Sequence, residues 1–153
     1  MKAYILLLLF ELFLNYDTEA ALNYAKEYCD RPYPIYSKLD PKKGISAMFA
    51  SRVIHAGKFS VMVCNEWADE DRFIPSSHGL MRCLSRHGWK SSKKFPKNFK
   101  PGYPLFFADG YSMIAGTVNG KDDIRVYAHS PYTCNEYVDL KDEDVVYYYL
   151  DED

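Results

Sequence analysis

Residues 111–128 read YSMIAGTVNGKDDIRVYA, and this stretch decides the fold class. Two runs rich in β-branched and aromatic residues, Tyr111–Val118 and Ile124–Ala128, flank a polar segment that begins with Asn119-Gly120. An Asn-Gly step between two such runs is a strong signal of a β-hairpin. The stretch therefore predicts two neighbouring antiparallel strands.

The sequence around this hairpin predicts further strands and, upstream of them, helices. Short β-forming runs separated by turn residues occur at Leu105–Phe107, Tyr137–Leu140 and Val145–Leu150. Apolar residues recur at helical spacing over residues 17–29, 45–56 and 77–87, whereas Lys90–Gly102 has the composition of a loop. Helices followed by antiparallel strands indicate an α+β domain, with three helices packed on a sheet of four to six strands.

Length and composition indicate one globular domain. The chain has 153 residues, of which 48% are hydrophobic, and the 14 tyrosines and 9 phenylalanines supply enough apolar surface to exclude extensive disorder. The formal net charge is only −2, so there is no global attraction to nucleic acid, and we expect no nucleic-acid partner. Nothing in the composition indicates an oligomer, and we expect a monomer.

The N-terminal residues resemble a secretory signal. Lys2 precedes a short apolar stretch, Ala3–Leu14, and small residues follow at Ala20 and Ala21. We expect residues 1–20 to be a signal peptide, with cleavage between residues 15 and 20, and residues 21–153 to form one secreted domain. This stretch of twelve residues, which includes Glu11, is too short to span a bilayer, so no integral membrane association is expected after cleavage. The alternative is a buried first helix.

Four cysteines, Cys29, Cys64, Cys83 and Cys134, remain after this cleavage. Their spacing matches no zinc motif, so we expect no metal site and no cofactor. In an oxidising compartment an even number of cysteines predicts two disulfides, for which three pairings are possible. We favour Cys64 with Cys83, because this loop is the shortest, which leaves Cys29 to pair with Cys134.

Several short motifs occur in the order found in a known family. A helix pattern places tyrosine and alanine at Tyr16, Ala20, Ala21, Tyr24 and Ala25, and the next helix has Ser46, Phe49, Ser51, Ala56 and Gly57. Further along are Pro101-Gly102-Tyr103, Tyr111-Ser112-Met113-Ile114-Ala115 and Tyr127-Ala128-His129-Ser130. In these motifs the chain resembles the putative amidase domain family, a papain-like group related to bacterial cell-wall peptidases. The resemblance covers residues 16–140 and also argues for cleavage near Asn15, because a cut after Ala20 would remove the first turn of the family helix.

The resemblance implies a papain-like site at which two catalytic positions have changed. Ser46 stands where the family has its nucleophilic cysteine, and Tyr111 stands where the family has the histidine that acts as the base. A serine hydroxyl needs a strong base, and tyrosine is a poor base at neutral pH. Only His129, which corresponds to the residue that orients the base, is retained.

Two functions follow from these substitutions. The favoured one is a secreted binding or effector domain that has lost its hydrolase activity. The alternative is an active amidase or peptidase that uses Ser46 with a histidine such as His129. A structural or toxin-like protein that acts through its outer surface is a third possibility.

A binding protein of this kind has two candidate surfaces. One is the remnant site around Ser46, Tyr111 and His129. The other is a basic arm, whose charged members are Arg82, Arg86, Lys90, Lys93, Lys94, Lys97 and Lys100, interleaved with Trp89, Phe95 and Phe99. Such an arm suits an anionic glycan, a cell-wall fragment or a peptide, with the aromatic rings stacking on the ligand. The alternative is a solvated loop whose aromatic side chains pack inward.

Overall fold

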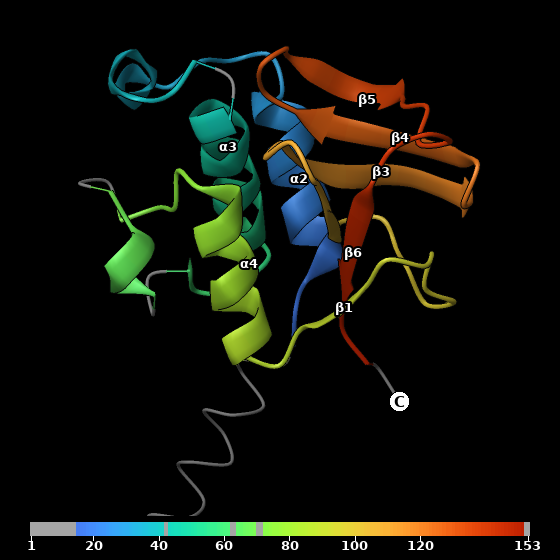
Figure 1. Ribbon diagram of the computed structural model, residues 1–153. Coiled ribbons are helices and arrows are strands. Elements are labelled where there is room, and N and C mark those ends of the chain that lie inside the picture. The colour runs from blue at the N-terminus through green and yellow to red at the C-terminus, as the bar shows by residue number, and fades with distance from the viewer. Residues whose placement is uncertain (1–14, 42, 62–63, 70–71, 152–153) are drawn as a thin grey trace, which may run out of the picture.

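The computed structural model describes residues 15–41, 43–61, 64–69 and 72–151 (Figure 1). Residues 1–14, which hold most of the expected signal peptide, lie outside this range. None of the helices in the described ranges is long and apolar enough to cross a membrane.

Three α-helices form where the apolar spacing predicts them. They are α2 (Thr18–Tyr28), α3 (Lys43–Ala56) and α4 (Ser77–Arg86), accompanied by the 3₁₀ turns η1 (Pro34–Lys38) and η3 (Asn65–Trp67). The carboxylate of Asp17 accepts a hydrogen bond from Ala20 N at 2.9 Å and so caps α2, while the hydroxyl of Ser76 caps α4 in the same way.

Six antiparallel strands form one sheet. They are β1 (Lys90–Ser92), β2 (Pro104–Phe107), β3 (Ser112–Gly120), β4 (Asp123–Ala128), β5 (Thr133–Tyr137) and β6 (Val145–Tyr149), in the spatial order β1-β6-β2-β3-β4-β5. Three helices and a six-stranded antiparallel sheet confirm the α+β prediction.

Three details of the sheet differ from the sequence prediction. Lys90–Ser92, expected in a loop, forms the edge strand β1 against β6. The strand expected at Tyr137–Leu140 lies earlier, at Thr133–Tyr137. The predicted hairpin between β3 and β4 is present. Gly120 pairs with Asp123, however, so the turn falls on Lys121-Asp122, just after the Asn-Gly step.

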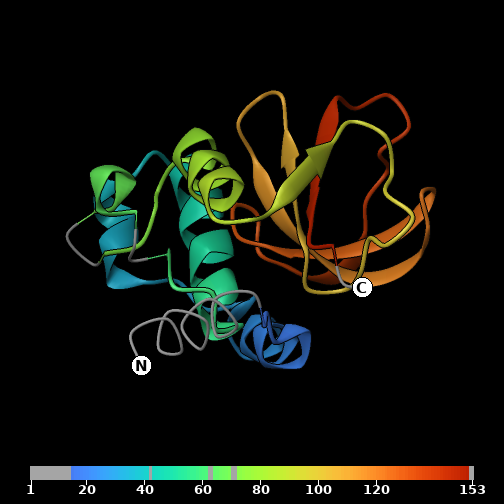
Figure 2. The ribbon, with the colours of Figure 1, turned by 90° about the horizontal axis from the view of Figure 1, so that it is seen from below.

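The helices gather on one side of the molecule and the curved sheet lies on the other (Figure 2). Helix α3 occupies the centre, where it contacts α2, α4, β3 and β4. Its central position explains its burial, since Phe49, Ala50, Val53 and Ile54 are all fully buried. The first turn of α3 is thereby held against the start of β3, where the remnant site is expected.

Both predicted disulfides are present. Cys29, at the end of α2, is bonded to Cys134 in β5, and Cys64 is bonded to Cys83 in α4. The structure thus selects the favoured pairing from the three that were open.

Tyr16 and Asp17, which precede α2, belong to the folded domain. The ring of Tyr16 is buried, its hydroxyl donates to Gly102 O at 2.8 Å, and Asp17 N donates to Gly57 O at 2.8 Å. Cleavage after Ala20 would remove both residues and the first turn of α2, whereas cleavage near Asn15 would keep them. The signal peptide itself stays a prediction.

Replacing Gly57 with alanine should destabilise the fold. A Cβ atom on Gly57 would lie 2.3 Å from Cε1 of Tyr16, whose buried ring also packs edge-on against Trp89. Because this ring cannot swing aside without losing its hydrogen bond to Gly102, we expect Gly57→Ala to lower the free energy of unfolding by about 2–3 kcal/mol in chemical denaturation.

Gly44→Ala is the matched control for this variant. There the new Cβ would come no closer than 3.3 Å to Asp40 Cβ, so a change within about 1 kcal/mol is expected. Equal losses in the two variants would show that the contact with Tyr16 is not the cause.

Candidate functional site

Ser46 lies in the first turn of α3 and is buried, with 1% of its surface exposed. Its hydroxyl donates to Lys43 O at 3.0 Å and accepts a hydrogen bond from Ser112 N at 3.1 Å. Neither partner can take a proton from the hydroxyl. Ser46 therefore joins the start of α3 to the start of β3, and its geometry is that of a structural hydroxyl.

A second pair of buried hydroxyls continues from this point. Ser77, the first residue of α4, donates to Gly110 O at 2.6 Å, so its oxygen is the acceptor in the hydrogen bond with the Ser112 hydroxyl. Sequence reasoning did not single out Ser77 or Ser112, although Ser112 is part of the motif that begins at Tyr111. These contacts hold the N-terminal ends of α3 and α4 against β3.

Tyr111 immediately precedes β3, and the structure does not direct its side chain at Ser46. Side chains alternate between the faces of a strand, and Ser112 faces α3 and α4. Tyr111 instead shares a hollow of about 180 Å³ with Met113 and Val138, and in the part of the chain that the structure describes its hydroxyl has no hydrogen-bond partner.

His129 is completely buried, and both of its ring nitrogens are engaged. Nε2 lies 2.7 Å from Tyr28 O, so it must carry the proton and donate it to this carbonyl. Nδ1 is then the acceptor in the hydrogen bond with the Tyr36 hydroxyl. The ring stacks on Phe49 of α3, with the centroids 3.9 Å apart.

This environment holds His129 in its neutral form. Burial lowers the pKa of its imidazole to about 4, against the opposing effects of the Tyr28 carbonyl and the Asp30 carboxylate. Burial also raises the pKa of Tyr36, which keeps that hydroxyl protonated as the donor. The lone pair on Nδ1, which a general base would use, is already occupied.

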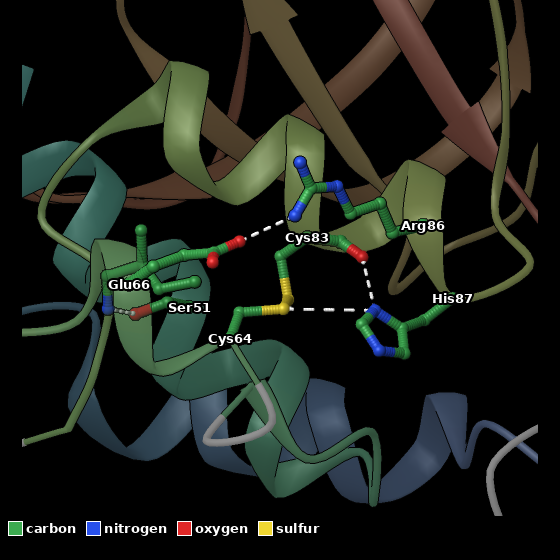
Figure 3. The surroundings of a disulfide bond; sticks show 7 residues. Ser51, Cys64, Glu66, Cys83, Arg86 and His87 are labelled. Atoms are coloured by element: carbon green, nitrogen blue, oxygen red, sulfur yellow. Dashed lines mark hydrogen bonds and ion pairs between the residues drawn. A yellow bond between two sulfur atoms is a disulfide. The ribbon is translucent and has the colours of Figure 1, made fainter.

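Two other histidines, His78 and His87, make hydrogen bonds to groups other than Ser46. His78 accepts a hydrogen bond from Arg82 Nε at 3.1 Å on the exposed side of α4. His87 follows α4, where its Nδ1 donates to Cys83 O at 2.8 Å and lies 3.8 Å from Cys64 Sγ (Figure 3).

Cys64, Cys83 and His87 form a group whose potential ligand atoms all lie within 4.8 Å of one another. Cysteines bind zinc as thiolates, but the two sulfur atoms here are bonded to each other (Figure 3). In the oxidised protein this group therefore offers one imidazole, and its role is to join α4 to the segment around η3.

The basic arm is partly neutralised. Arg86 makes an ion pair with Glu66 at 2.6 Å, and Lys90 makes one with Asp151. Trp89 and Phe99 are buried, and both Phe95 and Phe99 pack edge-on against Tyr147 of β6. These aromatic side chains pack inward, as expected for the alternative interpretation of the arm as a solvated loop. Its remaining exposed charges are Arg82, Lys93, Lys94 and Lys97, while Lys100 is half-buried.

Comparison of the sequence with known proteins identifies a family. Residues 15–104 match the model of one family, described as a putative amidase domain. The chain belongs to this family. No match was found among curated proteins or among solved structures.

The matched segment runs from the start of α2 to the start of β2 and includes Ser46. Tyr111 and His129 lie beyond it. The equivalence of Ser46, Tyr111 and His129 to catalytic positions of the family stays a prediction. Ser51, another motif position, has a structural role: its hydroxyl donates to Met48 O at 2.9 Å and accepts from Ile74 N at 3.2 Å.

Proposed function

We propose that this amidase-family domain is a secreted binding protein without hydrolase activity. The observation that carries the proposal is the full engagement of Ser46, whose only proton is donated to a backbone carbonyl and whose acceptor is used by Ser112 N. Acyl transfer needs a nucleophile within hydrogen-bond reach of a base. The two disulfides support secretion, because such bonds persist in oxidising compartments.

The second candidate is an amidase or peptidase that uses Ser46 with His129. It keeps the family chemistry, but it would need His129 to release both Tyr28 and Tyr36 and leave its stack on Phe49. It would also need Ser46, now buried, to become accessible to a substrate.

Thiol reactivity at position 46 separates the two candidates. All four native cysteines are in disulfides, so Ser46→Cys introduces a single free thiol. A site that activates a nucleophile lowers a thiol pKa well below its usual value of about 8.5, whereas burial without a base raises it. We therefore expect alkylation of this thiol to be slow and to accelerate only above about pH 8.5.

Ser91→Cys, on the exposed strand β1, provides the reference rate for an accessible thiol. Parallel assays of the parent protein and of Ser46→Ala on peptide amides and peptidoglycan fragments should both remain at background. Turnover by the parent that Ser46→Ala abolishes, or rapid alkylation of Ser46→Cys near neutral pH, would establish the amidase instead.

A further inference from the structure

A hollow of about 560 Å³ opens on the part of the sheet away from the three helices. Three segments that are far apart in the sequence form its wall: the segment after β1, the β3–β4 turn and the connection from β5 to β6. Figure 2 shows the segment after β1, in yellow-green, running past the open side of the sheet. The lining residues are Lys93, Phe95, Lys121, Asp122, Tyr137, Asp139, Leu140, Lys141, Glu143, Val145 and Tyr147.

The charged groups of this hollow are balanced. Three lysines face three carboxylates, so the formal charge of the lining is zero. In the described part of the chain, the ammonium groups of Lys93, Lys121 and Lys141 make no ion pair or hydrogen bond. These groups remain available to a ligand as hydrogen-bond donors. The carboxylates offer acceptors, although Asp139 Oδ1 already accepts from Lys141 N at 3.0 Å.

An aromatic surface completes the hollow. Tyr137 is 57% exposed, which is unusual for a ring of its size, while Phe95 and Tyr147 pack against each other edge-on. Tyr147 is buried, and burial together with the charge of Asp122 raises the pKa of its hydroxyl. A tyrosine ring with polar groups around it can contact an apolar face and hydroxyl groups of the same ligand.

We propose that this hollow binds an uncharged oligosaccharide. Sugar hydroxyls both donate and accept hydrogen bonds, so they can pair with ammonium and carboxylate groups at once, and the C–H face of a sugar ring can lie on Tyr137. An anionic ligand would leave Asp122, Asp139 and Glu143 facing like charge. The volume lies within the range of about 300–1,000 Å³ that small-ligand sites occupy.

This proposal goes beyond the loss of hydrolysis, because the hollow shares no lining residue with Ser46, Tyr111 or His129. Its failure would leave the proposed absence of turnover untouched, and turnover at Ser46 would leave the hollow untouched. It also changes the expected partner, since the basic arm contributes only Lys93 of its charged residues to a neutral site.

Titration calorimetry with the full-length protein tests the proposal. The probes are cellohexaose, maltohexaose and hexa-N-acetylchitohexaose, with hexagalacturonate as the charged probe of equal length. We expect at least one uncharged probe to bind, with an affinity that changes less than about twofold between roughly 50 and 500 mM NaCl, because screening acts on charged ligands.

Two pairs of variants locate the site and identify the ligand class. Tyr137→Ala should weaken binding by about tenfold, whereas Tyr132→Ala, which removes a ring that is 48% exposed outside the hollow, should leave it unchanged. Lys141→Ala and Glu143→Ala should each weaken binding by about three- to tenfold, because the hydroxyls of a neutral sugar use both signs of charge.

The opposite results would overturn the proposal. An anionic ligand would bind more tightly to Glu143→Ala, more weakly to Lys141→Ala, and hardly at all in high salt. Preference for hexagalacturonate with this pattern assigns the hollow to an anion. Absence of binding by every uncharged probe at about 1 mM, with the parent folded, refutes the sugar site.

Discussion

A Cys29→Ser/Cys134→Ser variant is expected to lose about 4–5 kcal/mol of unfolding free energy, the largest effect that we predict. The bond joins the end of α2 to β5, and 105 residues separate the two cysteines. Without it, the unfolded chain gains the conformational freedom of this long loop. Denaturation in guanidinium chloride, with the other disulfide kept oxidised, measures the loss.

Cys64→Ser/Cys83→Ser is the matched comparison within the same chain. This bond spans 19 residues, so the loop-entropy account gives about 3 kcal/mol, roughly 1.5 kcal/mol less than for the longer loop. Each bond joins a helix to another segment: Cys29 lies at the end of α2, and Cys83 lies in α4. Cys29, Cys64 and Cys83 are all buried. If removing the Cys64–Cys83 bond lowers the free energy of unfolding by as much or more, packing around these two cysteines matters more than loop length.

Local patterns were sufficient to predict most of the fold. Apolar spacing located α2, α3 and α4. Helices α2 and α4 each bury one side and have a capping residue, Asp17 and Ser76, whereas the central helix α3 is buried on most of its surface. Strand β1 could not be predicted in this way. Lys90, Ser91 and Ser92 have no apolar alternation, and they are extended because they pair with Tyr147–Tyr149, more than fifty residues further along the chain.

The displaced strand β5 has a similar explanation. Tyr137–Leu140 is a short run with the β-forming residues Tyr137 and Val138, which predicted a strand there. The segment that pairs with β4 is instead Thr133–Tyr137. Its side chains are mostly exposed, so its sequence has no clear apolar alternation from which a strand could be predicted. Its position is determined by pairing with β4 and by the disulfide from Cys134 to Cys29.

Resemblance to the family singled out Ser46 as a candidate site residue but did not predict its contacts. Spacing within the sequence shows that Ser46 begins a helix, whereas its acceptor role depends on Ser112 N, 66 residues away. The same holds for His129, whose partners Tyr28 and Tyr36 lie 101 and 93 residues upstream. Interactions over such separations depend on how α2, η1 and β4 meet, which no local pattern encodes.

Acidification should destabilise the protein through His129. Its pKa is lowered to about 4 in the folded state, while an unfolded histidine titrates near 6.5. Between these values the unfolded chain binds a proton that the folded chain does not, so stability rises with pH. The contribution is complete above about pH 6.5 and is lost as the pH falls to about 4, a change of about 3 kcal/mol.

His129→Gln provides the comparison, since an amide can hydrogen-bond to Tyr28 O and Tyr36 without titrating in this range. We expect it to be less stable than the parent at pH 7 but to have a flatter dependence of unfolding free energy on pH between about 4 and 6.5. Part of the slope should persist, because burial and Arg52 also lower the pKa of His55. His55→Gln should remove this smaller part.

The pH profile also bears on function, because it reports whether His129 is neutral in the folded protein. A general base must be neutral near the working pH and must present its lone pair to the nucleophile. His129 meets the first condition, but its Nδ1 accepts from Tyr36 while its Nε2 donates to Tyr28 O. If Tyr36→Phe raised the pKa of His129 toward 6.5 and produced turnover that depends on Ser46, the histidine would be a masked base. We expect this variant to lose stability and to gain no activity, because the imidazole would remain stacked on Phe49 and hydrogen-bonded to Tyr28.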